Sequence, residues 1–241
     1  EIVSRDWSSD VCSSDLDATI FLEKYVSPAR HIEVQIVADA HGNVRAFGER
    51  ECSIQRRNQK LVEEAPSVAV TPAIREQICA AAVAAARSCG YRNAGTVEFL
   101  LDRDGRFYFL EVNARLQVEH PVTELVCGGI DLVALQIAVA NGEAIPDPDA
   151  PPSPTGWAIE CRINGEDPYT FMPSLGLVEH VQAPLGPGTR FDSMLFSGLD
   201  VPVFYDSLLG KLIVWAETRD LAIRRMRRAL NDLVIRSEEH T

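Results

Sequence analysis

Residues 94–113, AGTVEFLLDRDGRFYFLEVN, limit the possible folds of this chain more than any other segment. Two runs rich in β-branched and aromatic residues flank DRDG, a cluster of turn-forming residues. This pattern is typical of an antiparallel β-hairpin. A second pair of runs, at 31–39 and 44–51, flanks AHGN and predicts another hairpin. The sequence therefore favours antiparallel β structure in the first half of the chain.

Helices are predicted between and after these hairpins. Residues 71–90 predict a helix, because Thr71 can cap its start, Pro72 suits the first turn and Gly90 suits the end. Residues 131–143 predict a short helix. Residues 219–233 predict the last helix, with the basic run at 224–228 on its solvated face. Its apolar residues follow a helical period: Leu221, Ile223, Met226, Ala229, Leu230 and Leu233. Further strands are predicted at 157–164, 176–184, 189–195 and 210–217.

The segment AIPDPDAPPSPTG at 144–156 has five prolines in thirteen residues and predicts a linker between two domains. The first domain is expected over 17–143 and the second over 157–235. Residues 1–16 and the tail at 236–241 resemble translated sequencing-adapter sequence, so neither enters the fold prediction.

Composition excludes several classes of function. A net charge of −12 argues against nonspecific nucleic-acid binding. The chain has no run of 18 apolar residues, which would indicate a membrane span, and its first residues lack a secretory pattern. Its six cysteines show no CxxC spacing. They favour reduced thiols in a cytosol-like compartment over a disulfide framework or a zinc site.

Strand alternation places Glu111, Asn113 and Arg115 on one face of the second hairpin. A two-residue loop puts Glu98 opposite Glu111, and a four-residue loop puts it on the diagonal. A three-residue loop puts the two acids on opposite faces.

Where the two acids are neighbours, a divalent cation removes their repulsion. Glu98, Glu111 and Asn113 form a hard oxygen set that suits Mg²⁺ or Mn²⁺. Zinc is disfavoured because this cluster of strand positions contains no His or Cys. The alternative is a solvated polar face on which Arg115 pairs with one acid.

Arg115 and Glu119 suggest a second task. A planar guanidinium binds carboxylate or bicarbonate through two parallel hydrogen bonds. Glu119 would then be a free carboxylate near a bound anion, in the position of a general base. Spacing alone does not separate this role from that of an ordinary ion pair.

Several motifs together resemble biotin carboxylase, the ATP-grasp component of biotin-dependent carboxylases, over residues 18–235. They are FLEKYV at 21–26, ERECSIQRRNQKLVEEAP at 49–66, GTVEF at 95–99, EVNARLQVEHPVTE at 111–124 and IECRINGEDP at 159–168. E-x-N-x-R is shared among ATP-grasp ligases, whereas QVEHPVTE and ECRINGEDP are more specific. The resemblance implies an α+β fold: the C-terminal part of an ATP-grasp domain, an antiparallel sheet with helices, followed by a biotin carboxylase C-terminal α+β domain.

The resemblance implies ATP-dependent carboxylation of biotin on a carrier protein. Bicarbonate attacks the γ-phosphate of Mg-ATP, and the carboxyphosphate that forms releases CO₂ to the ureido nitrogen of biotin. The implied cofactors are two Mg²⁺ or Mn²⁺ ions, with ATP as substrate and biotin on the carrier. The implied partners are a biotin carboxyl carrier protein or domain, a carboxyltransferase component and a second subunit of a homodimer. The implied compartment is the cytoplasm, or the mitochondrial matrix in a eukaryote.

Residue roles follow from the motif matches. Glu98, Glu111 and Asn113 would hold the metal against the ATP phosphates. Arg115, Gln117 and the backbone of Val118 would bind bicarbonate with Lys60 nearby. Glu119 would take the proton of bicarbonate, and Arg162 would stabilise the biotin enolate. The other matches would lie along the nucleotide: Glu23, Lys24 and Val26 at the adenine hinge, then His31, Glu33, Gln55 and Asn58. Asn58 departs from the family pattern, in which some members have His.

The family's N-terminal domain, its Gly-rich lid and its upstream ATP-binding lysines have no match in this sequence. Because lid closure excludes water and completes such a site, the polypeptide by itself is expected to be catalytically inactive. The expected system is an acetyl-, propionyl- or methylcrotonyl-CoA carboxylase. The alternatives are a pyruvate or urea carboxylase, another ATP-grasp ligase such as a carbamoyl-phosphate synthetase relative, and a non-catalytic fragment that binds nucleotide or a partner protein.

Overall fold

A computed structural model describes residues 24–174, 176–201 and 207–237. Its helices are α1 (Pro72–Ser88), α2 (His120–Val126), α3 (Leu132–Ala140) and α4 (Arg219–Asp232). Its strands are β1 (Arg30–Ala38), β2 (Val44–Arg56), β3 (Gln59–Ala65), β4 (Asn93–Leu101), β5 (Phe107–Asn113), β6 (Trp157–Asn164), β7 (Gly176–Gln182), β8 (Thr189–Ser193), β9 (Asp200–Val201), β10 (Leu208–Ala216) and β11 (Val234–Ser237).

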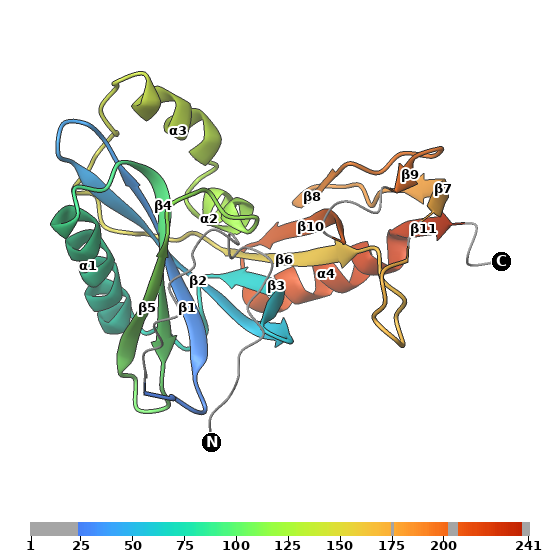
Figure 1. The fold of residues 1–241 in the computed structure, drawn as a ribbon, viewed down its shortest axis with the longest axis horizontal. Coiled ribbons are helices and arrows are strands. Elements are labelled where there is room, and N and C mark those ends of the chain that lie inside the picture. Colours follow the sequence, from blue (N-terminus) through green and yellow to red (C-terminus); the bar gives the residue numbers. More distant parts are fainter. Residues whose placement is uncertain (1–23, 175, 202–206, 238–241) are drawn as a thin grey trace, which may run out of the picture.

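One eight-stranded antiparallel sheet forms the centre of the molecule, in the order β5-β4-β1-β2-β3-β6-β10-β8 (Figure 1). A small sheet, β11-β7-β9, lies beyond α4. The α+β class predicted from the sequence is therefore confirmed.

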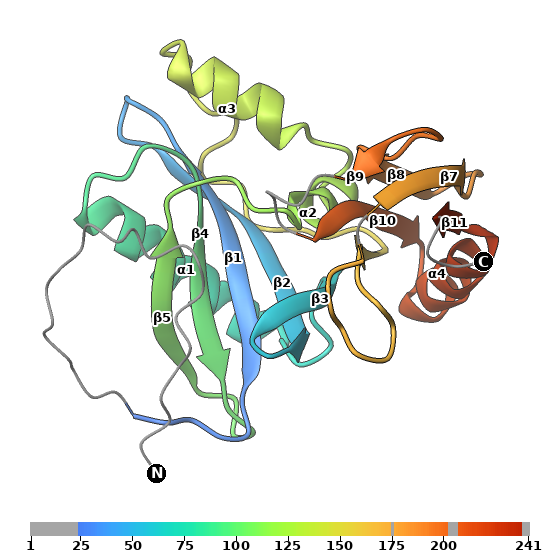
Figure 2. The same cartoon turned by 45° about the vertical axis from the view of Figure 1, so that its right-hand side comes forward.

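Alternation along the strands gives the large sheet two different faces. On one face, Ile32 and Ile36 of β1 pack against Ile78 of α1, while Leu212 of β10 packs against Met226 of α4. On the other face, α2 packs on β6 and β10, and α3 packs near β4 (Figure 2). Charged and amide side chains gather on this second face, between α2 and the strands.

Both predicted hairpins form, as β1–β2 and β4–β5. The helix predicted at 71–90 is α1, and the Thr71 side chain accepts a hydrogen bond from the Ile74 backbone N–H. The sequence analysis missed β3, α2, β9 and β11. The charged strand β3 (QKLVEEA) is held by pairing with β2 on one side and β6 on the other, so its formation depends on distant segments.

The turn of the β4–β5 hairpin is a three-residue loop, 103–105, because the Asp102 N–H donates to the Arg106 carbonyl. A regular ladder would then place Glu98 opposite Leu110. A β-bulge after the Phe99–Phe109 pair shifts the register, so Glu98 lies directly opposite Glu111. The expectation that a three-residue loop separates the two acids is therefore wrong, because it did not include a bulge.

The apolar positions expected along the last helix are buried to different extents. Met226 and Ala229, together with Ala222, form the buried stripe of α4, whereas Leu221 and Leu230 are 44% and 41% exposed. The basic run at 224–228 does lie mainly on the outer face of α4, as expected.

The proline-rich segment at 144–156 leads directly into β6, which pairs with β3. One sheet therefore extends on both sides of the predicted domain boundary, and the division into two domains stays a prediction. In the part of the chain that the structure describes, no helix has both the length and the apolar character needed to cross a membrane.

Candidate active site

A row of charged residues crosses four neighbouring strands on the face that carries α2. Arg50 of β2 lies opposite Glu33 of β1, Glu33 lies opposite Glu98 of β4, and Glu98 lies opposite Glu111 of β5. Directly opposed like charges destabilise a sheet. This row therefore requires cations around it.

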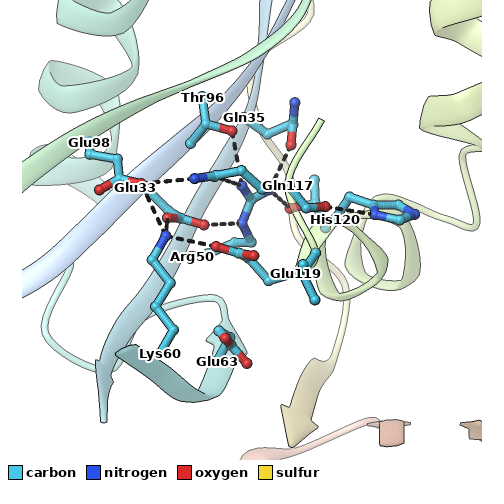
Figure 3. Close-up of polar contacts among 12 residues, drawn as sticks. Glu33, Gln35, Arg50, Lys60, Glu63, Thr96, Glu98, Gln117, Glu119 and His120 are labelled. Carbon is cyan, nitrogen blue, oxygen red and sulfur yellow. Dashed lines mark hydrogen bonds and ion pairs between the residues drawn. The ribbon is translucent and has the colours of Figure 1, made fainter. Parts of the chain in front are cut away.

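Lys60 of β3 supplies one of these cations. Its Nζ lies 2.5 Å from Glu33 Oε2, 3.0 Å from Glu98 Oε1 and 2.7 Å from Glu119 Oε1 (Figure 3). Burial disfavours the ammonium ion, but the negative charge of Glu33 and the neighbouring acids outweighs burial and raises the pKa of Lys60. Lys60 therefore stays charged and links three acids from three different segments.

Arg50 supplies the second cation and was missed in the sequence analysis. It is fully buried, and its Nε lies 2.5 Å from Glu33 Oε1. Its other nitrogens donate to Gln35, Thr96 and Gln117 (Figure 3). One of them also donates to Thr123. The signal was available in the sequence: a charged residue at the centre of the run ERE, inside a predicted strand.

These cations keep two of the acids ionised. Burial works to raise the pKa of Glu33, but the charges of Arg50 and Lys60 outweigh it and lower that pKa to about 2. Burial likewise opposes ionisation of Glu98, but the hydrogen bond from His31 and the charge of Lys60 lower its pKa to about 2. Both carboxylates are therefore charged at neutral pH.

The segment after β5 folds back over this row before α2 begins at His120. Gln117 Nε2 donates to Glu98 Oε1 at 2.8 Å, and Lys211 Nζ donates to the Val118 carbonyl at 2.5 Å. Glu119 is 1% exposed, and its two oxygens accept from Lys60 and from an Arg162 nitrogen 3.0 Å away. Glu119 is therefore not a free carboxylate but forms ion pairs with two cations, the alternative that spacing left open, and its role as a general base stays a prediction.

Arg162 of β6 connects this segment to the second half of the sheet. Its Nε donates to Glu63 Oε1 at 2.7 Å, while another of its nitrogens reaches Glu119. Glu63 of β3 was missed in the sequence analysis. Its position in the register could not be inferred before β3 and β6 were known to pair.

The three predicted metal ligands lie together. Asn113 Nδ2 donates to Glu98 Oε1 at 3.0 Å and to Glu111 Oε1 at 3.2 Å. His31 Nε2 also lies 2.7 Å from Glu98 Oε2, and Gln55 contacts His31 Nδ1 at 3.0 Å. The statement that no histidine lies in the cluster is therefore wrong, because β1 pairs with β4 and brings His31 to it.

Arg115 is exposed, and its side chain donates to the Leu116 carbonyl. Among the described residues no carboxylate forms an ion pair with Arg115, so the alternative in which it pairs with an acid is wrong. Its guanidinium is available to an anion.

The other predicted nucleotide residues take no part in the contacts described above. Asn58 is exposed in the turn between β2 and β3, with a φ of 64°. Lys24 lies over the Tyr108 ring at 5.5 Å, and Val26 precedes β1. Glu23 lies outside the described residues. Their roles along the nucleotide stay predictions.

Comparisons with known proteins agree with this arrangement. Residues 7–147 match the model of the "Carbamoyl-phosphate synthase L chain, ATP binding domain", and residues 160–241 match that of the "Biotin carboxylase C-terminal domain". The biotin carboxylase of a Nostoc species is 52% identical over 220 residues, covering 91% of this chain and 49% of the relative. A pyruvate carboxylase subunit of Methanothermobacter thermautotrophicus is 51% identical over 220 residues, covering 91% and 44%.

Among solved structures, the biotin carboxylase domain dimer of Hydrogenobacter thermophilus 2-oxoglutarate carboxylase, in complex with MgADP, ADP and bicarbonate, is similar to this chain. Its TM-score is 0.86 and its identity is 48%, with 89% of this chain and 48% of that chain covered. The fold and the matched domains define an ATP-grasp protein. The chain belongs to the biotin carboxylase family. It spans about half the length of the curated relatives it matches.

Proposed function

We propose that the protein containing this chain carboxylates biotin on a carrier protein, using ATP and bicarbonate. The observation that supports this most directly is that Glu98, Glu111 and Asn113 lie beside residues 117–119. Lys60 and Arg162 hold this segment through Glu119. A divalent cation bound there would offset the charge that develops on the phosphoryl oxygens. Rotation of the Asn113 amide would turn its oxygen toward such an ion.

The residues proposed to bind bicarbonate follow the proposed metal ligands along the chain. Among the described residues the Arg115 guanidinium donates to the Leu116 carbonyl but has no carboxylate partner, which suits binding of a planar anion. Gln117 and Val118 are held in place by Arg50 and Lys211, so this segment is ordered before an anion binds. Glu119 would take the proton of bicarbonate as an oxygen attacks the γ-phosphate and ADP leaves. Lys60 and Arg162 would hold the Glu119 carboxylate in place, and Arg162 would stabilise the biotin enolate.

The proposed partners are a biotin carrier domain, a carboxyltransferase component and a second copy of the chain. The similar 2-oxoglutarate carboxylase domain is a dimer, which supports the last of these. We propose an acyl-CoA as the final acceptor. The 51% identity to a pyruvate carboxylase subunit makes pyruvate carboxylase the second candidate. The compartment stays a prediction.

The metal assignment is tested by Mn²⁺ binding to the 241-residue chain, followed by electron paramagnetic resonance. Glu111→Gln is expected to weaken binding by about tenfold or more, because it removes one anionic ligand. Glu143→Gln, an exposed position after α3, serves as the control and is expected to leave binding unchanged. Equal Mn²⁺ affinity in wild type and Glu111→Gln would overturn the assignment.

The reaction class is tested by ATP hydrolysis in the longer protein that contains this chain. Stimulation by bicarbonate and free biotin is expected. Hydrolysis that ammonia stimulates and biotin does not would favour a carbamoyl-phosphate synthetase relative instead.

A further inference from the structure

Two buried glutamates face each other behind Arg162. The register of β3 and β6 places Glu63 directly opposite Glu160, and both side chains are 0% exposed. Directly opposed residues in an antiparallel pair have Cβ atoms about 5 Å apart and point to the same face. Figure 3 shows Glu63 on the same strand as Lys60.

Most oxygens of this pair have no hydrogen-bond partner among the described residues. Glu63 Oε1 accepts from Arg162, but Glu63 Oε2 and both oxygens of Glu160 are buried and unpaired. Two ionised carboxylates in this arrangement would repel each other, and their free oxygens would be poorly solvated. A proton on one acid turns it into a donor for the other.

The charges around the pair also indicate one extra proton. Five buried acids of the site are Glu33, Glu98, Glu119, Glu63 and Glu160. The four cations that contact or face them are Arg50, Lys60, Arg162 and Lys211, which leaves one negative charge without a partner. The groups next to Lys211 are His120 of α2 and the more exposed Arg190 and Asp192 of β8.

We propose that Glu63 and Glu160 hold one proton between them, and that this proton lets the Glu63 carboxylate position Arg162 toward Glu119. Burial raises the pKa of Glu63 to about 7 against the opposing charge of Arg162. Burial and the charge of Glu63 raise the pKa of Glu160 well above its usual value. Because Arg162 binds Glu63 while both oxygens of Glu160 lack a partner among the described residues, the proton resides mainly on Glu160, and Glu63 stays the anion that binds Arg162. The importance of Arg162 for turnover rests on the proposed function, whereas the shared proton does not.

Carbon-13 NMR of the glutamate carboxyls in the 241-residue chain tests the shared proton. In wild type, one glutamate is expected to titrate at least two pH units above the ordinary value of about 4.3. Glu160→Gln, a neutral mimic of the protonated acid, is expected to remove that step. Glu64→Gln is the matched control, because Glu64 bonds Arg219 and Trp157 instead, and it is expected to keep the step.

The wild-type titration decides the question even if a variant does not fold. A chain in which every glutamate titrates below about pH 5.5 would overturn the shared proton. If a glutamate still titrates at this raised pH in folded Glu160→Gln, the assignment of that titration to Glu63 and Glu160 would be overturned.

Positioning is tested by the nitrogen-15 resonance of Arg162 Nε. In wild type its chemical shift is expected to change over the same pH range in which the high-pKa glutamate titrates. In Glu160→Gln it is expected to be independent of pH over that range. The exposed Arg115 is the internal control and should not follow the step. If the chemical shift of Arg162 Nε in wild type does not change as the glutamate pair titrates, the pair does not position Arg162. None of these readouts requires turnover or metal, so they stay valid if the proposed function fails.

Discussion

Lys60 connects carboxylates from three separate segments: Glu33 on β1, Glu98 on β4 and Glu119 before α2. Its side chain is 13% exposed, so water screens these contacts only weakly. Removing one partner of a buried ion pair leaves the other charge buried and unpaired. The stability of the site therefore depends strongly on this lysine.

We expect Lys60→Met to lower the free energy of unfolding at pH 7 by about 3 kcal/mol, the usual cost of breaking a buried ion pair. Lys24→Met, at an exposed lysine over Tyr108, is the control and should change it by less than about 1 kcal/mol. Urea unfolding of the three proteins measures both effects. A Lys60→Met variant as stable as the control variant would contradict this account of the site.

The effect of Lys60 should also depend on pH. The folded-state pKa values of Glu33 and Glu98 are lowered from 4.5 to about 2, so the stabilisation they give is fully present above pH 4.5 and is lost as the pH falls toward 2. We therefore expect the difference in unfolding free energy between wild type and Lys60→Met to shrink between pH 5 and pH 3. A difference that grows on acidification would show that Lys60 does not stabilise these carboxylates.

At the scale of elements, α1 is the helix whose ends the sequence predicts best. Thr71 accepts from the Ile74 N–H at 3.3 Å, and Gly90, with a φ of 61°, follows the helix end at Cys89. Ile78 and Ala82 then bury one side of the helix against β1 and β2. Local signals and tertiary packing agree here, so the prediction of this helix is confirmed.

Thr71→Ala is expected to reduce the free energy of unfolding by about 1 kcal/mol, because it leaves the Ile74 N–H without its capping partner. Thr71→Ser keeps the hydroxyl and should retain most of the stability. Thermal and urea unfolding compare the two variants. An equal loss in both would mean that the cap bond contributes little.

At the scale of the whole molecule, the pairing of β3 with β6 makes one sheet from segments on either side of the proline-rich run. Arg162 and Lys211 extend from the second half of this sheet to Glu119 and Val118 of the first half. The candidate site is therefore built from both halves, and its geometry requires both to be folded.

Because the sheet is continuous, we expect β1 and β10 to unfold together. Native-state hydrogen exchange should give buried amides in both strands the same opening free energy, within about 1 kcal/mol. Earlier opening of β6, β10 and α4, with β1 and β4 still protected, would show instead that the two halves unfold as separate units.

The sequence by itself determined the strands and helices that have a regular apolar pattern, and the types of side chain at the site. Strand alternation identified the shared face of Glu111 and Asn113, and turn residues identified both hairpins, because these signals act over a few neighbouring residues. The family motifs indicated Lys60 and Arg162 as site residues, but only through resemblance.

Only the tertiary structure decided which strands lie side by side. Strand order brings His31 and Glu33 to Glu98, places Arg50 opposite Glu33 and sets Glu63 opposite Glu160. A single bulge restored the pairing of Glu98 with Glu111 that the turn alone would have lost. These contacts join residues up to about a hundred positions apart. They depend on burial and pairing across the sheet, which no local pattern of residues records.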